Sequence, residues 1–112
     1  MPGRPGTWRS ASPAPGGEEH LYVIAYDIAD RRRWRRVFRV MQGYGEWLQL
    51  SVFQCRLSRR RCAELKLTLE ELLNHAEDHL IMLDLGPAET LRPRVESLGK
   101  PFVMVERGPV IV

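Results

Sequence analysis

The stretch YVIAYDIADRRRWRRVFR, from Tyr22 to Arg39, decides how the fold begins. The run Leu21–Ile28 is apolar and rich in β-branched and aromatic residues, which predicts a buried β-strand. Asp27 interrupts this run. Asp30 can cap a helix that begins at Arg31, because its side chain can accept hydrogen bonds from free amides of the first turn. The stretch therefore predicts a strand, a short acidic turn and a basic helix.

The helix is expected to cover Arg31–Tyr44. Its apolar residues recur at spacings of three and four and form one stripe that can face a core: Trp34, Val37, Phe38, Met41 and Tyr44. Arginines occupy most of the remaining circumference, and Gly43 and Gly45 end the helix.

The next segment, Glu46–Leu57, alternates imperfectly and reads as extended chain. One face would carry Trp47, Ser51, Phe53, Cys55 and Leu57, and the other face Leu48, Leu50 and Val52. Because both faces carry apolar residues, we expect both to be covered, one by helices and the other by a second copy of the protein.

The rest of the chain supplies a second helix and further strands. Ser58 is a plausible cap for this helix, whose apolar stripe is Cys62, Leu65, Leu69, Leu72, Leu73 and Ala76. Asp78–Leu85 reads as a buried strand, residues 87–100 as a loop with one helical turn around Arg94–Leu98, and Pro101–Val112 as one or two short strands. If Trp47–Leu57 bends or pairs twice, the order becomes β-α-β-β-α-β. This is the α+β, ferredoxin-like arrangement, with an extra C-terminal strand and a homodimer through the open sheet face.

Size and composition indicate a single folded unit. The 112 residues suffice for one domain, expected over residues 19–112. Residues 1–18 are rich in Pro, Gly and Ser and predict a flexible tail. No apolar run approaches the roughly 20 residues that span a bilayer, and the start lacks the apolar core of a signal peptide. Cys55 and Cys62 read as buried thiols rather than a disulfide or zinc site, so the expected location is the cytoplasm.

Asp27 is the first candidate for chemistry. An isolated acid at the end of a strand more often only hydrogen-bonds to a turn, but Asp27 stands just before a helix and a cluster of arginines. Mg²⁺ usually takes one or two carboxylates with water and phosphate oxygens, so one Asp27 is too little by itself. A two-fold dimer would bring two copies of Asp27 together, and a cation held there could activate water for attack on phosphorus.

The basic residues predict binding to a phosphate backbone. Six arginines fall within nine residues, namely Arg31, Arg32, Arg33, Arg35, Arg36 and Arg39. Guanidinium groups contact phosphate oxygens bidentately, and without a base-reading element such binding is independent of sequence and sensitive to salt. A second basic cluster comprises Arg56, Arg59, Arg60 and Arg61. A plain solvated helix face is the alternative for either cluster.

His75 and His79 lie four residues apart, a spacing that could place two metal ligands on one helix face. A solvated helix end is favoured over a metal site there.

The motifs YVIAYDI-x-D, RR-x-RRV and GYGEWLQLSVF-x-C-x-L, with a terminal VIV, resemble the small CRISPR-associated adaptation proteins called Cas-two. The resemblance implies a ferredoxin-like homodimer with Asp27 near the two-fold axis as the catalytic Mg²⁺ ligand. It also implies a metal-dependent endonuclease on RNA or double-stranded DNA that bridges Cas-one integrase dimers and binds spacer DNA. Arg32, Arg33, Arg35 and Arg36 match the family's basic positions, and Phe53 matches an aromatic with a structural or dimer role. Two positions depart from the family pattern: Gln54 stands where many members have Glu, and Trp47 stands where Arg or Lys is common.

Two other functions stay open. The protein could be a non-catalytic adaptor, in which the arginines hold DNA, the C-terminal strand contacts the integrase and Asp27 is structural. It could also be a module for single-stranded RNA, in which aromatic side chains on an open sheet face stack on bases. The candidates for such stacking are Tyr22, Tyr26 and Phe53.

Overall fold

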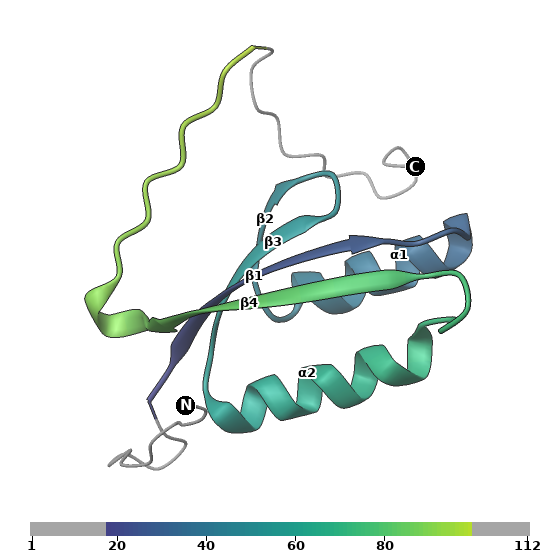
Figure 1. Ribbon diagram of the computed structural model, residues 1–112, viewed down its shortest axis with the longest axis horizontal. Coiled ribbons are helices and arrows are strands. Elements are labelled where there is room, and N and C mark those ends of the chain that lie inside the picture. The colour runs from purple at the N-terminus through teal and green to yellow at the C-terminus, as the bar shows by residue number, and fades with distance from the viewer. Residues whose placement is uncertain (1–17, 100–112) are drawn as a thin grey trace.

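A computed structural model of the chain describes residues 18–99. The expected N-terminal tail, apart from Glu18, and the expected C-terminal strand lie outside the described residues. Figure 1 shows the order of the elements, which are β1 (His20–Asp27), α1 (Arg31–Gln42), β2 (Glu46–Gln49), β3 (Val52–Leu57), α2 (Arg59–Leu72), β4 (His79–Pro87) and a 3-10 turn, η1 (Ala88–Thr90). The expected β-α-β-β-α-β order is confirmed.

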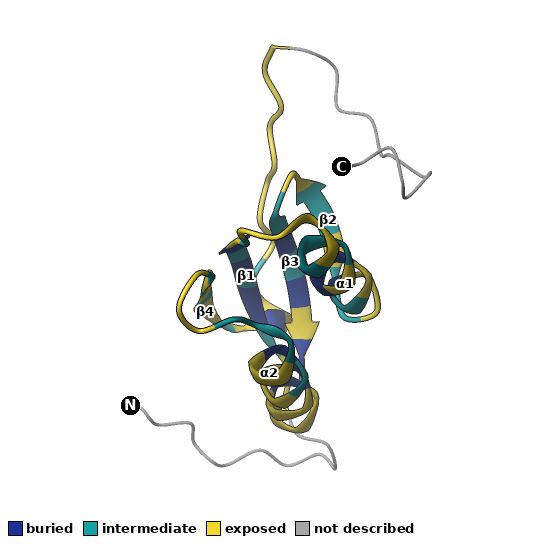
Figure 2. Cartoon of the chain, turned by 90° about the vertical axis from the view of Figure 1, so that its right-hand side faces the viewer, coloured by how far each residue is buried: buried dark blue, intermediate teal, exposed yellow. Residues whose placement is uncertain are grey.

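The four strands form one antiparallel sheet in the order β2-β3-β1-β4. Both helices lie on one side of it, as Figure 2 shows. This strand order with two helices on one face is the ferredoxin-like arrangement. The sheet places β1 at its centre, so the strand that ends in Asp27 is paired on both sides.

Side chains of β1 alternate between two environments, as the period of two in a strand requires. Tyr22, Ile24 and Tyr26 belong to the core between the sheet and the helices. The intervening Val23, Ala25 and Asp27 therefore point away from the helices. We call that side of the sheet the open face; on β1 and β4 it carries Val23, Ala25, Asp27, Ile81, Leu83 and Leu85.

Both helices begin at the expected caps. The backbone amide of Arg33 donates to Asp30 Oδ2 over 2.9 Å, and that of Arg61 donates to Ser58 Oγ over 3.1 Å. The buried face of α1 comprises Val37, Phe38 and Met41, and that of α2 comprises Cys62, Leu65 and Leu69. Helix α1 ends at Gln42, two residues before the expected end, because the Gly43 amide already turns back onto the Val40 carbonyl.

The long segment after α1 divides into two strands at Leu50 and Ser51. Leu50 has φ of 35°, a left-handed conformation that is rare for residues with a Cβ, and its side chain is 73% exposed. Two indole groups support this turn: Trp47 Nε1 donates to the Leu50 carbonyl over 3.0 Å, and Trp34 Nε1 donates to Ser51 Oγ over 2.7 Å. The segment thus pairs twice, as the ferredoxin-like reading required.

Three expectations from the sequence need correction. Tyr22, Tyr26 and Phe53 are buried in the core, so they are not open-face aromatics that could stack on bases. Arg94–Leu98 is not helical, because Val95 and Leu98 are 64% and 89% exposed and have no apolar surface against which a helix could pack. Figure 1 shows this segment extending away from the sheet. The strand expected to be buried over Asp78–Leu85 is not buried within the described residues, since Ile81, Leu83 and Leu85 are each about half exposed on the open face.

The cysteines behave as expected. Cys55 and Cys62 are buried and unpaired, and burial raises the pKa of the Cys55 thiol to about 11. Across residues 18–99, no helix combines the length and the apolar character that crossing a membrane requires.

Candidate functional site

Asp27 is the last residue of β1 and its side chain is exposed on the open face. Within residues 18–99 its carboxylate accepts no hydrogen bond and forms no ion pair. The alternative considered for such an acid, a hydrogen bond to the following turn, is therefore not its role here. A rigid strand holds this carboxylate in place while its oxygens stay available to a ligand.

A second acid follows in the turn but has another task. The Asp30 carboxylate caps α1, as described above, and is thereby committed to a backbone amide. No group of three or more His, Cys, Asp or Glu residues in the described part of the chain could hold a metal ion. One chain thus offers Mg²⁺ a single free carboxylate at this position, which fits the cation only if water, phosphate or a second chain supplies the remaining ligands.

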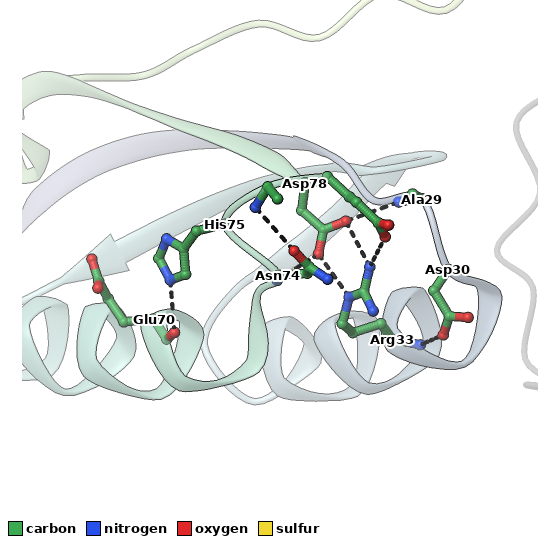
Figure 3. Close-up of polar contacts among 9 residues, drawn as sticks. Ala29, Asp30, Arg33, Glu70, Asn74, His75 and Asp78 are labelled. Carbon is green, nitrogen blue, oxygen red and sulfur yellow. Dashed lines mark hydrogen bonds and ion pairs between the residues drawn. The ribbon is translucent and has the colours of Figure 1, made fainter.

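The turn between β1 and α1 is fixed by Asp78, which precedes β4 (Figure 3). Arg33 donates to its carboxylate twice, from Nε over 2.7 Å and from Nη2 over 3.0 Å. The backbone amides of Ala29 and Asn74 donate to the same carboxylate over 3.0 Å and 2.9 Å. The Asp78 side chain is fully buried by these contacts. The Asp78 carboxylate therefore joins three segments: the turn at Ala29, the first turn of α1 and the turn before β4.

These contacts change the protonation equilibrium of Asp78. The hydrogen bonds from Arg33 hold the pKa of the Asp78 carboxyl far below its usual range, and the amides of Asn74 and Ala29 lower it further against the opposing effect of burial. The same contact raises the pKa of Arg33 above its usual value. Both groups are consequently charged at any pH at which the protein would work.

The structure divides the arginines predicted to bind nucleic acid into two groups. Arg33 is occupied by Asp78 and by Glu77, whose Oε1 lies 3.2 Å from Nη2. Arg35 is half-buried, and its Nε has no hydrogen-bond partner among the described residues. The other four, Arg31, Arg32, Arg36 and Arg39, are exposed. Three of them follow one another at helical spacings of four and three residues, namely Arg32, Arg36 and Arg39, and we call these three the arginine row. The row begins in the first turn of α1, close in sequence to Asp27.

The second basic cluster lies at the other end of the sheet. Leu57 at the end of β3 pairs with His20 at the start of β1, so α2 begins at the end opposite Asp27. Arg61 covers the Tyr44 ring at 4.3 Å and donates to the Gly43 carbonyl over 3.1 Å. Arg56 donates to the Ala88 carbonyl over 3.3 Å. This cluster partly serves to hold the domain together, and it cannot share one site with Asp27 of the same chain.

One neighbour of Asp27 was not predicted as such from the sequence. His79 is the first residue of β4 and pairs directly with Asp27 across the two strands. The spacing of His75 and His79 suggested one helix end, but only His75 lies near α2, where its ring contacts the Glu70 carbonyl at 3.2 Å. No periodicity in the sequence specifies the register of β4 on β1, so the pairing could not be foreseen.

Comparisons with known proteins identify the family of the chain. The sequence model of the family described as CRISPR associated protein Cas2, the Cas-two family named above, matches residues 20–92. A CRISPR-associated endoribonuclease Cas2 of Geobacter sulfurreducens is 56% identical over 94 residues, which cover 84% of this chain and 99% of the relative. A Cas2 endoribonuclease of Rhodospirillum rubrum is 56% identical over 94 residues, covering 84% of this chain and 92% of that protein.

Solved structures show the same fold. A crystal structure of a hypothetical protein, TT1823, from Thermus thermophilus has a TM-score of 0.62 at 34% identity, covering 75% of this chain and 96% of that chain. A crystal structure of Streptococcus pyogenes Cas2 also has a TM-score of 0.62, at 27% identity, and covers 70% of this chain and 99% of that chain. With the family match over β1 to η1 and relatives of nearly the same length, the chain belongs to the CRISPR-associated Cas2 family.

Proposed function

We propose that this protein is a metal-dependent endonuclease that hydrolyses phosphodiester bonds of RNA or double-stranded DNA and acts in spacer acquisition during CRISPR defence. The observation that carries the proposal is the free, exposed carboxylate of Asp27 at the end of a central strand, just before the helix that bears the arginine row. The nuclease activity named for the relatives of Geobacter and Rhodospirillum supports the same reading.

The proposed division of labour follows from charge and exposure. Asp27 holds a divalent cation, expected to be Mg²⁺, which when bound would act as a Lewis acid and provide a nucleophilic water. Arg32, Arg36 and Arg39 bind phosphates along the backbone without reading bases. Arg33 contributes indirectly, because its contact with Asp78 fixes the turn that follows Asp27. Phe53 contributes only as a buried part of the core.

A homodimer through the open face would complete this site. Ile81, Leu83 and Leu85 expose apolar surface beside Val23 and Ala25, on the side of the sheet opposite the helices. A two-fold contact buries the same patch on both copies, and Asp27 lies at one end of that patch. With the axis at that end of the patch, the two Asp27 carboxylates would supply the second acid that one chain lacks.

The decisive test is cleavage by an Asp27→Asn variant. We expect loss of Mg²⁺-dependent cleavage of RNA and duplex DNA, with an unchanged thermal unfolding midpoint, since the Asp27 side chain forms no hydrogen bond or ion pair within the described residues. Glu71→Gln is the matched control, because it removes an exposed acid from α2 on the helix side of the sheet. Cleavage by Asp27→Asn at the wild-type rate would refute the proposal.

A second function is favoured by the segment after β4. Residues 91–99 extend from the sheet and expose Val95 and Leu98, which is a suitable arrangement for binding another protein. In this alternative the chain is a dimeric adaptor that holds spacer DNA with its arginines and bridges the Cas-one integrase. Two unpaired thiols are compatible with either function in the reducing cytoplasm, the location that we propose.

Spacer acquisition in cells separates the two functions. If Asp27→Asn supports acquisition at the wild-type level while the double variant Val95→Ser/Leu98→Ser does not, the adaptor function is the one that acquisition requires. If Asp27→Asn stops acquisition although the protein still folds and binds the integrase, the adaptor alone is insufficient.

A further inference from the structure

His79 and Asp27 are directly opposed in the antiparallel pair of β4 and β1. Residues opposed in this way have Cβ atoms about 4.5–5.5 Å apart and point to the same side of the sheet. The neighbouring pairs agree: Tyr26 and Leu80 both pack on the core, so the next pair along the strands faces the other way. The imidazole of His79 and the carboxylate of Asp27 therefore stand side by side on the open face.

Both side chains are available to a ligand. Both are exposed, and within residues 18–99 neither forms a hydrogen bond or an ion pair with another side chain or the backbone. The hydrogen bonds of Asp78 hold the backbone next to both residues in place. Asp78 immediately precedes His79, and its carboxylate accepts a hydrogen bond from the amide of Ala29, two residues after Asp27. Two free donor groups are thus held on adjacent, rigid strand ends.

The combination of donors determines which cation is preferred. Mg²⁺ takes oxygen ligands almost exclusively and retains much of its water. An imidazole nitrogen instead favours divalent transition metals, while a carboxylate suits Mn²⁺ as well as Mg²⁺. A site built from Asp27 and His79 would hence bind Mn²⁺ better than a site built from Asp27 alone.

We propose that His79 is a second protein ligand of the cation held by Asp27, and that it makes the site prefer Mn²⁺ to Mg²⁺. The inference rests on the proposed function in that it takes Asp27 as a metal ligand. It goes further by assigning a second residue of the same chain and the class of metal that this residue selects. Sequence spacing paired His79 with His75; the strand register pairs it with Asp27.

Metal binding by the full chain tests this without reference to activity. Dissociation constants of Mn²⁺ and of Mg²⁺ are measured for the wild type, His79→Ala, Asp27→Asn and His75→Ala. His75→Ala is the matched control, because it removes the same side chain four residues earlier, where the ring contacts a backbone carbonyl of α2. Loss of even an outer partner of a metal ligand lowers affinity about 10–100-fold, so loss of a direct ligand should weaken Mn²⁺ binding by about tenfold or more.

We expect His79→Ala to weaken Mn²⁺ binding to this extent, to leave Mg²⁺ binding nearly unchanged, and to match the wild type in its unfolding midpoint. Pulsed electron paramagnetic resonance of bound Mn²⁺ should show coupling to a nitrogen nucleus in the wild type and in His75→Ala, and none in His79→Ala or in the milder His79→Gln.

The outcomes distinguish failure of this inference from failure of the proposed function. If Asp27→Asn abolishes metal binding but His79→Ala behaves like His75→Ala, Asp27 remains a metal ligand and His79 is not one. An equal loss of Mn²⁺ and Mg²⁺ in His79→Ala would overturn the stated preference. If the wild type binds neither cation, or Asp27→Asn binds both like the wild type, the metal site itself is wrong, and the role of His79 falls with it.

Discussion

Arg33 and Asp78 form a two-point contact, 2.7 Å and 3.0 Å long, between the first turn of the basic helix and the residue before β4. The carboxylate is fully buried and also binds two backbone amides, one of them from the turn after Asp27. An arginine that the sequence assigned to nucleic acid therefore also joins two parts of the fold. The arginine row on the same helix stays exposed.

This contact makes Arg33 more important for stability than any other arginine of the first cluster. Arg33→Ala leaves a buried carboxylate without its charged partner, which is a costly arrangement. We expect the thermal unfolding midpoint to fall by about 5 °C or more, as for a substantial loss of stability in a domain of this size. Circular dichroism on heating measures this. Arg32→Ala, one residue away and exposed, is the control, and an equal small change in both variants would contradict the assignment.

The depressed pKa of Asp78 predicts a particular pH dependence of stability. Below the ordinary carboxyl pKa of about 3.9, the unfolded chain takes up a proton that the folded chain resists, so stability falls as the pH decreases from there. Asp78→Asn should be less stable than the wild type near neutral pH and should lose less stability on acidification. Unfolding midpoints between about pH 2 and pH 7 test this. Parallel curves for the wild type and Asp78→Asn would rule out Asp78 as the source, and Glu71→Gln should follow the wild type.

The arginine row should determine the salt dependence of nucleic-acid binding. Each contacted phosphate contributes about 0.9 to the slope of log affinity against log salt concentration on duplex DNA. Replacing Arg32, Arg36 and Arg39 by alanine should therefore weaken binding and reduce the slope by about 2 to 3. Fluorescence anisotropy at several salt concentrations measures both effects. Arg60→Ala, an exposed arginine of α2 at the opposite end of the sheet, should leave the slope nearly unchanged. A slope that responds to Arg60 and not to the row would place the interface at the other end.

If the open face is the dimer interface, a charged residue placed on it should prevent dimerisation. Leu83 is 50% exposed beside Val23, and a charge at this position in a dimer interface would be buried without a partner. Leu83→Glu should give a monomer in sedimentation experiments, with the fold retained. The control is Leu67→Glu, since Leu67 is 68% exposed on α2, on the helix side of the sheet. A dimer that survives Leu83→Glu would mean that another surface joins the subunits.

Local patterns explain why much of the fold was predictable. The apolar run of β1, the caps Asp30 and Ser58 and the buried stripe of α1 all depend on residues close in sequence, where propensity and periodicity act directly. The division of Glu46–Leu57 was less accessible. Its turn uses Leu50 with positive φ rather than Gly or Asn, and tertiary contacts of Trp34 and Trp47 override the local preference. The helical turn expected at Arg94–Leu98 lacked any such tertiary support.

The candidate site was predictable only in part. Asp27 and the exposed arginines follow from the order of residues along one strand and one helix. Arg33 with Asp78 and Asp27 with His79 are separated by about half the chain and depend on how β4 registers on β1. No spacing rule links residues so far apart, and charge alone did not distinguish Arg33 from Arg32. Pairs of this kind could be identified only from the folded structure.

The central position of β1 has a consequence for the order of events during synthesis. The ribosome makes β1 first, yet its partners β3 and β4 end 30 and 60 residues further along the chain, at Leu57 and Pro87. Until β4 has emerged, the basic helix is without Asp78, and Asp27 is without its neighbour strand. Proteins dominated by such distant pairings fold more slowly than those built from local contacts. On the proposed function, a nascent chain would thus expose its arginines to cellular RNA well before it could hold a metal, so nucleic-acid binding would come earlier than cleavage in the life of each molecule.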